Sequence, residues 1–226
     1  MNNLYLRTIR LMLVSAIAFL AFLFIPAGTF HYWRGWVFWG TFMVLSVLVY
    51  GWMAIYDKEL LERRLRAGPS AEKTREQKTL TAIGGPVVIV AFVMMVFDHR
   101  FGWSPAVPDW LSLVGDVLGV VGMLMYFIVI RENRFASSTV EVSQGQSVIS
   151  TGPYSVVRHP MYAGAILFFI GAPLALGSWW GLVFLPLFVA AFAWRCLNEE
   201  KFLCANLPGY PEYMRKVRYR LVPYVW

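Results

Sequence analysis

Long apolar stretches alternate along this chain with short clusters of charge. A helix needs about 20 mostly apolar residues to cross the hydrocarbon core of a bilayer, and two of the stretches approach or exceed that length. The pattern predicts an all-α, polytopic membrane helix bundle with about five to six transmembrane helices. The stretches lie at about 11–26, 35–56, 82–97, 110–130, 160–177 and 179–197.

The third and fifth stretches are shorter and contain or begin at Pro and Gly. Either could be tilted or partly re-entrant, which leaves the number of spans at five or six. The first stretch follows Arg7 and Arg10 as in a signal peptide, but no small-residue cleavage pattern comes after it, so we expect a retained helix. Gly115, Gly119 and Gly122 predict close helix packing, within the chain or in a dimer.

The positive charges are distributed unevenly between the stretches. If the N-terminus is cytoplasmic and six spans follow, all but Arg34 and Arg100 of the 20 Lys and Arg residues fall in cytoplasmic segments. An excess of Lys and Arg marks the cytoplasmic side. We therefore expect an integral protein of the cell inner membrane or an endomembrane, with both termini in the cytoplasm.

Two regions are expected on this plan. Residues 1–109 hold the first transmembrane helices and a charged cytoplasmic connector at 57–81, where Lys, Arg and Glu recur at helical spacing. We interpret the connector as a solvated helix or loop lying on lipid headgroups. Residues 110–226 form the second region, in which the polar residues of interest gather.

Composition supports the membrane interpretation. Apolar residues make up 58% of the chain and charged residues 15%, against about half and a quarter in soluble domains. The net charge is +7, and the basic residues lie between apolar stretches, where anionic lipid headgroups would attract them. We therefore expect no nucleic-acid partner. Cys196 and Cys204 match no metal-binding spacing, so no metal site is expected.

A first polar cluster, Arg158 and His159, stands directly before the fifth apolar stretch. Pro160 suits the first turn of a helix, so both side chains are expected at a helix N-terminus. The free N–H groups of such a terminus, together with the imidazole and the guanidinium, would form an anion site able to hold a carboxylate.

A second polar cluster, Arg195, Glu199 and Glu200, closes the sixth stretch. The short turn at Gly177 and Ser178 predicts an antiparallel hairpin of the last two helices, which would bring both clusters to one membrane face. Arg195 and Glu199 share a helix face, so an alternative is that they form an intrahelical ion pair with no further role. Ionisable side chains near the end of an apolar helix are costly unless they are paired or functional, so we predict a site at the cytoplasmic face.

The run GPYSVVRHPMYAG, followed about 35 residues later by R-x-x-x-E-E, resembles the isoprenylcysteine carboxyl methyltransferase and phospholipid methyltransferase superfamily. The resemblance extends over roughly 115–222. It implies an enzyme that transfers a methyl group from S-adenosyl-L-methionine to a lipophilic methyl acceptor from the bilayer, such as an isoprenylcysteine-like carboxylate or a lipid head group. It also implies that the cofactor lies between the start of one helix and the end of the other.

The resemblance also implies roles for individual residues. Glu199 would bind the ammonium or ribose hydroxyls, His159 and nearby N–H groups the carboxylate, and Arg195 would orient an anionic methyl acceptor. Arg195 and Glu199 are the catalytic candidates. A His of the eukaryotic isoprenylcysteine enzymes corresponds to Gln146 here. The cofactor-binding candidates are Gln146, Ile149, Gly152, Tyr154, His159, Pro160, Met161, Tyr162, Glu199 and Glu200.

Two other functions stay open at this point. Membrane reductases of the sterol-reductase type use NADPH and carry R-H-P-N-Y-x-G-E, whereas this chain reads RHPMYAGA, with Met161 and Ala165 at the differing positions. A non-catalytic scaffold with the same fold is the second alternative. The sequence leaves the methyl acceptor and the oligomeric state open.

Overall fold

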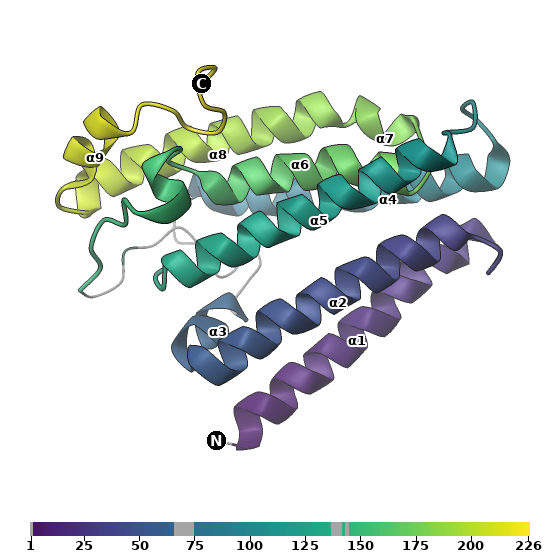
Figure 1. Cartoon of the computed structure of the whole chain (residues 1–226), viewed down its shortest axis with the longest axis horizontal. Helices are drawn as coiled ribbons and strands as arrows, with labels where there is room; N and C mark the ends of the chain where they lie inside the picture. Colours follow the sequence, from purple (N-terminus) through teal and green to yellow (C-terminus); the bar gives the residue numbers. More distant parts are fainter. Residues whose placement is uncertain (1, 66–74, 137–141, 143–144) are drawn as a thin grey trace.

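In the computed structural model of the chain, the described residues 2–65, 75–136, 142 and 145–226 are helical or irregular, without strands. The long helices lie side by side as a bundle (Figure 1). Both termini lie toward the end of the bundle that also carries the short helices α3 and α9 (Figure 1). The elements are α1 (Asn2–Ala27), α2 (Trp33–Tyr56), α3 (Lys58–Arg64), α4 (Arg75–Phe101), α5 (Asp109–Glu132), η2 (Gly152–Ser155), α6 (Pro160–Ala175), α7 (Trp180–Val183), α8 (Leu185–Asn206) and α9 (Tyr210–Lys216).

Within the described residues, five helical segments are long and apolar enough to cross a bilayer, which confirms the predicted polytopic helical membrane protein. One of them combines α7 and α8 into a segment of 27 residues, Trp180–Asn206. The apolar helix α6 has 16 residues and is shorter than a usual span. The predicted count of five to six therefore holds, with α6 as the segment that decides between the two numbers.

Glycines let α5 and α6 approach each other closely. A Cβ atom on Gly115 would lie 2.4 Å from the backbone N of Ala175, and one on Gly122 would lie 2.5 Å from the carbonyl O of Gly164. The contact is reciprocal, because a Cβ on Gly171 would lie 2.5 Å from the carbonyl O of Gly115. Small residues are the usual means of such close packing in membranes. The glycines predicted to pack closely thus serve a contact inside the chain, which fixes α6 in place.

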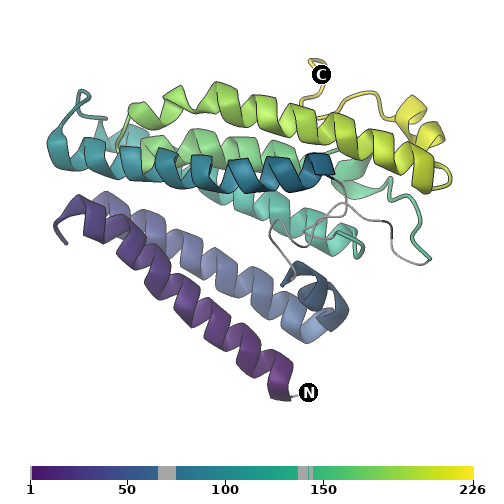
Figure 2. The ribbon, with the colours of Figure 1, turned by 180° about the vertical axis from the view of Figure 1, so that it is seen from behind.

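Helix α4 packs against α1 on one side and against α7 and α8 on the other. Figure 2 shows it lying along α8, with α1 and α2 forming a separate layer. This arrangement leaves one face of α4 and α8 uncovered by other helices, and Ile83 and Leu187 are exposed there.

The charged connector differs from its prediction. In its described part, Leu60 and Leu61 of α3 are fully buried against Met53 and Ile130, and Arg64 is 8% exposed. Leucines at adjacent positions could not remain in water at the membrane surface without cost, so α3 folds back onto the ends of α2 and α5. Lys58, Glu59 and Glu62 on the other face of α3 are exposed, so only one face of this helix departs from the solvated interpretation. Residues 66–74 of the connector lie outside the described part of the chain.

Candidate functional site

The hairpin of α6 with α7 and α8 brings the two polar clusters together. His159 caps the N-terminus of α6, with Pro160 in the first turn as expected. Its Nε2 atom lies 3.2 Å from Oε1 of Glu200, and its Nδ1 atom lies 3.9 Å from Oε2 of Glu199. Residues 40 positions apart in sequence thus share one site because the hairpin is tight.

Glu200 is the centre of a buried ion cluster. Its side chain is 5% exposed and accepts hydrogen bonds from Nε of Arg158 at 2.7 Å and from Nε of Arg220 at 2.9 Å. His159 reaches the same carboxylate. A buried carboxylate is stable only when charged and polar partners replace its water, and here three partners do so. Both oxygens of Glu200 are therefore already committed to the protein.

Several donors beside the expected anion site at the start of α6 are bonded within the protein. The backbone N–H of Arg158 donates to the carbonyl of Tyr219, and that of His159 donates to the carbonyl of Arg220, both at 2.9 Å. The guanidinium of Arg158 also donates to the carbonyls of Val217 and Arg218. The chain after α9 thus binds the Arg158 guanidinium and the two N–H groups that precede the helix. Its role was missed because nothing local in the sequence links it to residue 158.

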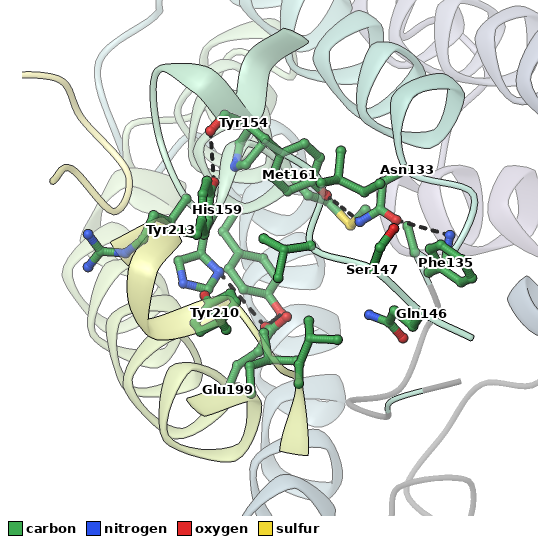
Figure 3. Close-up of a pocket in the computed structure, with 18 of the residues that line it drawn as sticks. Asn133, Phe135, Gln146, Ser147, Tyr154, His159, Met161, Glu199, Tyr210 and Tyr213 are labelled. Atoms are coloured by element: carbon green, nitrogen blue, oxygen red, sulfur yellow. Dashed lines mark hydrogen bonds and ion pairs between the residues drawn. The ribbon is translucent and has the colours of Figure 1, made fainter. Parts of the chain in front are cut away.

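A cavity lies beside these clusters and opens to the surface. It encloses about 860 Å³ of empty space, part of it open to solvent. Figure 3 shows His159 and Glu199 on one side of it and Gln146 and Ser147 on the other. The lining residues are Asn133, Phe135, Ala136, Gln146, Ser147, Val148, Ile149, Tyr154, Arg158, His159, Pro160, Met161, Tyr162, Arg195, Glu199, Leu203, Leu207, Tyr210 and Tyr213.

Nine of the eleven predicted site residues line this cavity, and Gly152 and Glu200 do not. Gly152 has a φ of +55°, and a Cβ atom there would lie 2.9 Å from the Glu132 carboxyl carbon. Its neighbour Thr151 donates to the same carboxylate. Gly152 therefore serves the tight turn against the end of α5, and Glu200 serves the ion cluster.

A chain of hydrogen bonds crosses the cavity wall from one candidate catalytic residue to the other. Nε of Arg195 donates to the hydroxyl of Tyr162 at 2.9 Å, and that hydroxyl donates to Oε2 of Glu199 at 2.6 Å. The Tyr162 ring also stacks on His159, with 5.6 Å between the ring centroids. Tyr162 thus links the cation and the carboxylate that face the cavity.

Tyrosines from outside the two clusters complete the wall. Burial raises the pKa of Tyr154 to about 12 and raises the pKa values of Tyr210 and Tyr213 as well, so all three stay neutral phenols. The Tyr213 hydroxyl donates to the carbonyl of Tyr154, and Asn133 donates to the Tyr154 hydroxyl. The spacing of Tyr210 and Tyr213, one helical turn apart in α9, was the available sequence signal. Lining residues that sequence reasoning missed include Asn133, Phe135, Leu203, Leu207, Tyr210 and Tyr213.

The connector reaches this wall through Arg64. Its Nη2 atom lies 3.5 Å from the sulfur of Met161, which lines the cavity, and its guanidinium lies 5.3 Å from the centre of the Tyr126 ring. The described part of the connector thus contacts both the cavity wall and α5 through Arg64.

Comparisons with known proteins point to one family. Residues 110–207 match the model of the phospholipid methyltransferase family, which covers α5 to the end of α8. The chain is also similar to a cobalt-zinc-cadmium resistance protein, CzcN, of Cupriavidus metallidurans, with 25% identity over 134 residues. That alignment covers 57% of this chain and 58% of the relative, so the chain spans little more than half of the relative's length. The resemblance drawn from the sequence motifs is confirmed.

Proposed function

From the match of residues 110–207 to the phospholipid methyltransferase family, we propose that the protein transfers a methyl group from S-adenosylmethionine to a lipophilic methyl acceptor. The family match itself supports a membrane methyltransferase. The cofactor, the class of methyl acceptor and the residue roles below are the proposal.

The single observation that carries the proposal is the contrast between two adjacent carboxylates beside one cavity. The Glu199 side chain is 24% exposed and lines the cavity, whereas the Glu200 side chain is 5% exposed and does not. The Glu199 carboxylate thus faces the cavity, where a ligand could reach it, while the Glu200 carboxylate is paired within the protein. A ligand that carries an ammonium group and ribose hydroxyls matches a carboxylate in this position.

The residues around Glu199 fit the rest of the cofactor. Tyr154, Tyr162 and Tyr210 offer neutral aromatic rings, which attract a cation such as a sulfonium and stack against a purine. When bound, the cofactor would supply an activated methyl group together with a good leaving group. The task of the protein is then to hold both partners in line and to exclude water.

Arg195 would meet the polar end of the methyl acceptor. Its guanidinium lines the same cavity as Glu199 and is held in place by the Tyr162 hydroxyl. A cation at this position attracts a carboxylate, which needs no general base at neutral pH. An amine would first have to lose a proton, and Glu199, which already accepts a hydrogen bond from Tyr162, would be the carboxylate available to take it. We favour an anionic acceptor because the guanidinium would repel a protonated amine.

The proposed orientation follows from charge. The site lies toward the end of the bundle that holds the termini, α3 and α9 (Figure 1). The segments at that end carry most of the Lys and Arg residues, which supports a cytoplasmic site and cytoplasmic termini in an inner membrane or endomembrane.

The experiment is a transfer assay. Purified protein is incubated with methyl-labelled S-adenosylmethionine and a total lipid extract, and the labelled product is identified by mass. We expect label in a lipid-soluble product, at a carboxylate, and binding of S-adenosylmethionine by calorimetry without binding of NADPH. Binding of NADPH alone, with no label transferred, would instead support a reductase.

A further inference from the structure

We infer that the apolar groove between α4 and α8 holds the hydrocarbon chain of the methyl acceptor, with its polar end at Arg195. This inference rests on the proposed function and specifies where that methyl acceptor lies. The groove encloses about 1180 Å³ of empty space, part of it open to the surroundings. Its walls are α4 from Leu80 to Val88 and α8 from Leu187 to Arg195, with Phe169 of α6 behind them.

Continuity with the cofactor cavity is the first argument. Arg195 lines both the groove and the cavity, so one side chain marks the place where they meet. A series of aromatic rings also leads from the wall of the groove to the wall of the cofactor cavity. Phe188 and Phe169 have ring centroids 4.2 Å apart, Phe169 and Phe192 are 6.1 Å apart, and Phe192 and Tyr162 are 5.5 Å apart. A chain lying on these rings would end at the Tyr162 hydroxyl and the Arg195 guanidinium.

The shape of the groove suits an extended chain. The stretch from Leu187 to Arg195 covers two turns of α8, or about 12 Å of helix. The two helices run in opposite directions, so Leu80 lies at the Arg195 level while Val88 lies nearer Leu187. The groove therefore leads from the polar site toward the middle of the bundle. Leu187 and Trp194 are exposed, which leaves the groove accessible from the lipid.

A pair of glycines opens the groove on the α4 side. Gly84 and Gly85 stand inside the helix, and a Cβ atom built on either would meet no heavy atom within 4 Å. Glycine weakens a helix interior relative to alanine, and here no close helix packing explains it, in contrast to Gly115 and Gly122. Two missing side chains next to a groove that ends at Arg195 are explained if a ligand chain takes their space.

The open space makes a sharp test possible, because a large side chain at Gly84 fills the groove without displacing protein atoms. Gly84→Leu is the test variant, and Gly40→Leu is its matched control. Gly40 stands in the transmembrane helix α2, also has nothing within 4 Å of a built Cβ, and does not line the groove. Ala190→Phe narrows the groove from the α8 wall, where Ala190 is exposed, and serves as a second variant.

Photolabelling reports on the groove without any need for activity. The probe is a long-chain fatty acid with a diazirine in its chain, added to wild type and variants in lipid nanodiscs, and the adducts are mapped by mass spectrometry. We expect adducts on 80–88 and 187–195 in wild type and Gly40→Leu, and about tenfold fewer in Gly84→Leu and Ala190→Phe. Equal adduct yields in these peptides in all four proteins would overturn the inference.

The transfer assay separates this inference from the proposed function. We expect Gly84→Leu to transfer about tenfold less label to the lipid extract, with its calorimetric affinity for S-adenosylmethionine unchanged. Full transfer by Gly84→Leu and Ala190→Phe would refute the groove and leave the methyltransferase standing. If wild type transfers no label, the proposed function fails, and the photolabelling result still decides whether the groove binds a lipid chain.

Discussion

Each end of the bundle carries a polar cluster around a buried carboxylate, but only one of the two clusters lies beside a cavity. At the end opposite the site, Asp98 accepts hydrogen bonds from Ser104 and from Ser178, and Tyr32 donates to the carbonyl of Leu176. These bonds tie together the loops that connect the helices, and Asp98, Ser178 and Tyr32 line neither of the two cavities described above. At the site end, Glu200 is closed in the same way, but the adjacent Glu199 faces a cavity.

The comparison shows that a buried polar residue near a membrane surface is not by itself a mark of function. Asp98 and Glu200 are both nearly inaccessible, and both are satisfied by partners from other segments. Glu199 and Arg195 differ because they share hydrogen bonds with Tyr162 and still face open space. Structural and ligand-facing polar groups should therefore respond differently to substitution.

The largest expected effect belongs to Glu200. Glu200→Ala would leave Arg158, Arg220 and His159 around an empty position, and removal of one partner from a buried ion pair costs about 3–5 kcal/mol of stability. The measurement is unfolding in detergent by heat or denaturant. Glu212→Ala removes an exposed acid from α9 and is the matched control. If Glu200→Ala unfolds like the control, the closed cluster does not hold the site together.

Glu199→Ala should have the opposite profile. We expect affinity for S-adenosylmethionine to fall about 100-fold by calorimetry, the equivalent of a charged hydrogen bond, with stability nearly unchanged. Glu199→Gln keeps the shape and one acceptor oxygen, so its loss should be smaller. Normal binding by Glu199→Ala would remove this residue from the cofactor site and with it the proposed distinction between the two carboxylates.

Arg195→Ala sharpens the comparison within the cavity. Turnover should fall about tenfold, because the polar end of the methyl acceptor loses a bidentate partner, while affinity for S-adenosylmethionine changes little. Arg195→Lys keeps the charge and should not restore turnover fully, since an ammonium cannot make the same paired contact. A collapse of cofactor affinity in Arg195→Ala would assign this residue to the cofactor instead.

The sequence predicted the helices and the hairpin because hydrophobic length and short turns are local properties. The sequence underestimated the length of helices whose ends carry charged residues. The apolar stretch at 82–97 becomes α4 from Arg75 to Phe101, because polar residues continue a helix into the interface that hydropathy does not register. The short hairpin turn at Gly177 also allowed the sequence to predict that the clusters of Arg158 and Glu200 lie at the same end of the bundle.

What the sequence could not separate was Glu199 from Glu200. Neighbouring helical positions differ by about 100°, and no local pattern says which of the two faces the cavity. The answer depends on Arg220, which reaches Glu200 from beyond α9, and on Tyr162, which reaches Glu199 from α6. The contact of Gly152 with Glu132 of α5 likewise has no local sequence signal.

The smallest expected effect is at the far end, where Asp98→Asn tests whether that end is only structural. Oδ1 of Asp98 accepts from the Ser104 N–H at 2.7 Å, and Oδ2 accepts from the hydroxyls of Ser104 and Ser178 at 2.6 Å each. An amide keeps the first bond, and the hydroxyls can rotate to accept from its NH₂ group, so stability should fall by only about 1 kcal/mol. Affinity for S-adenosylmethionine and transfer of label should match wild type. A change in cofactor affinity would mean that the two ends are coupled through the hairpin, since Ser178 lies in the turn that joins α6 to α7.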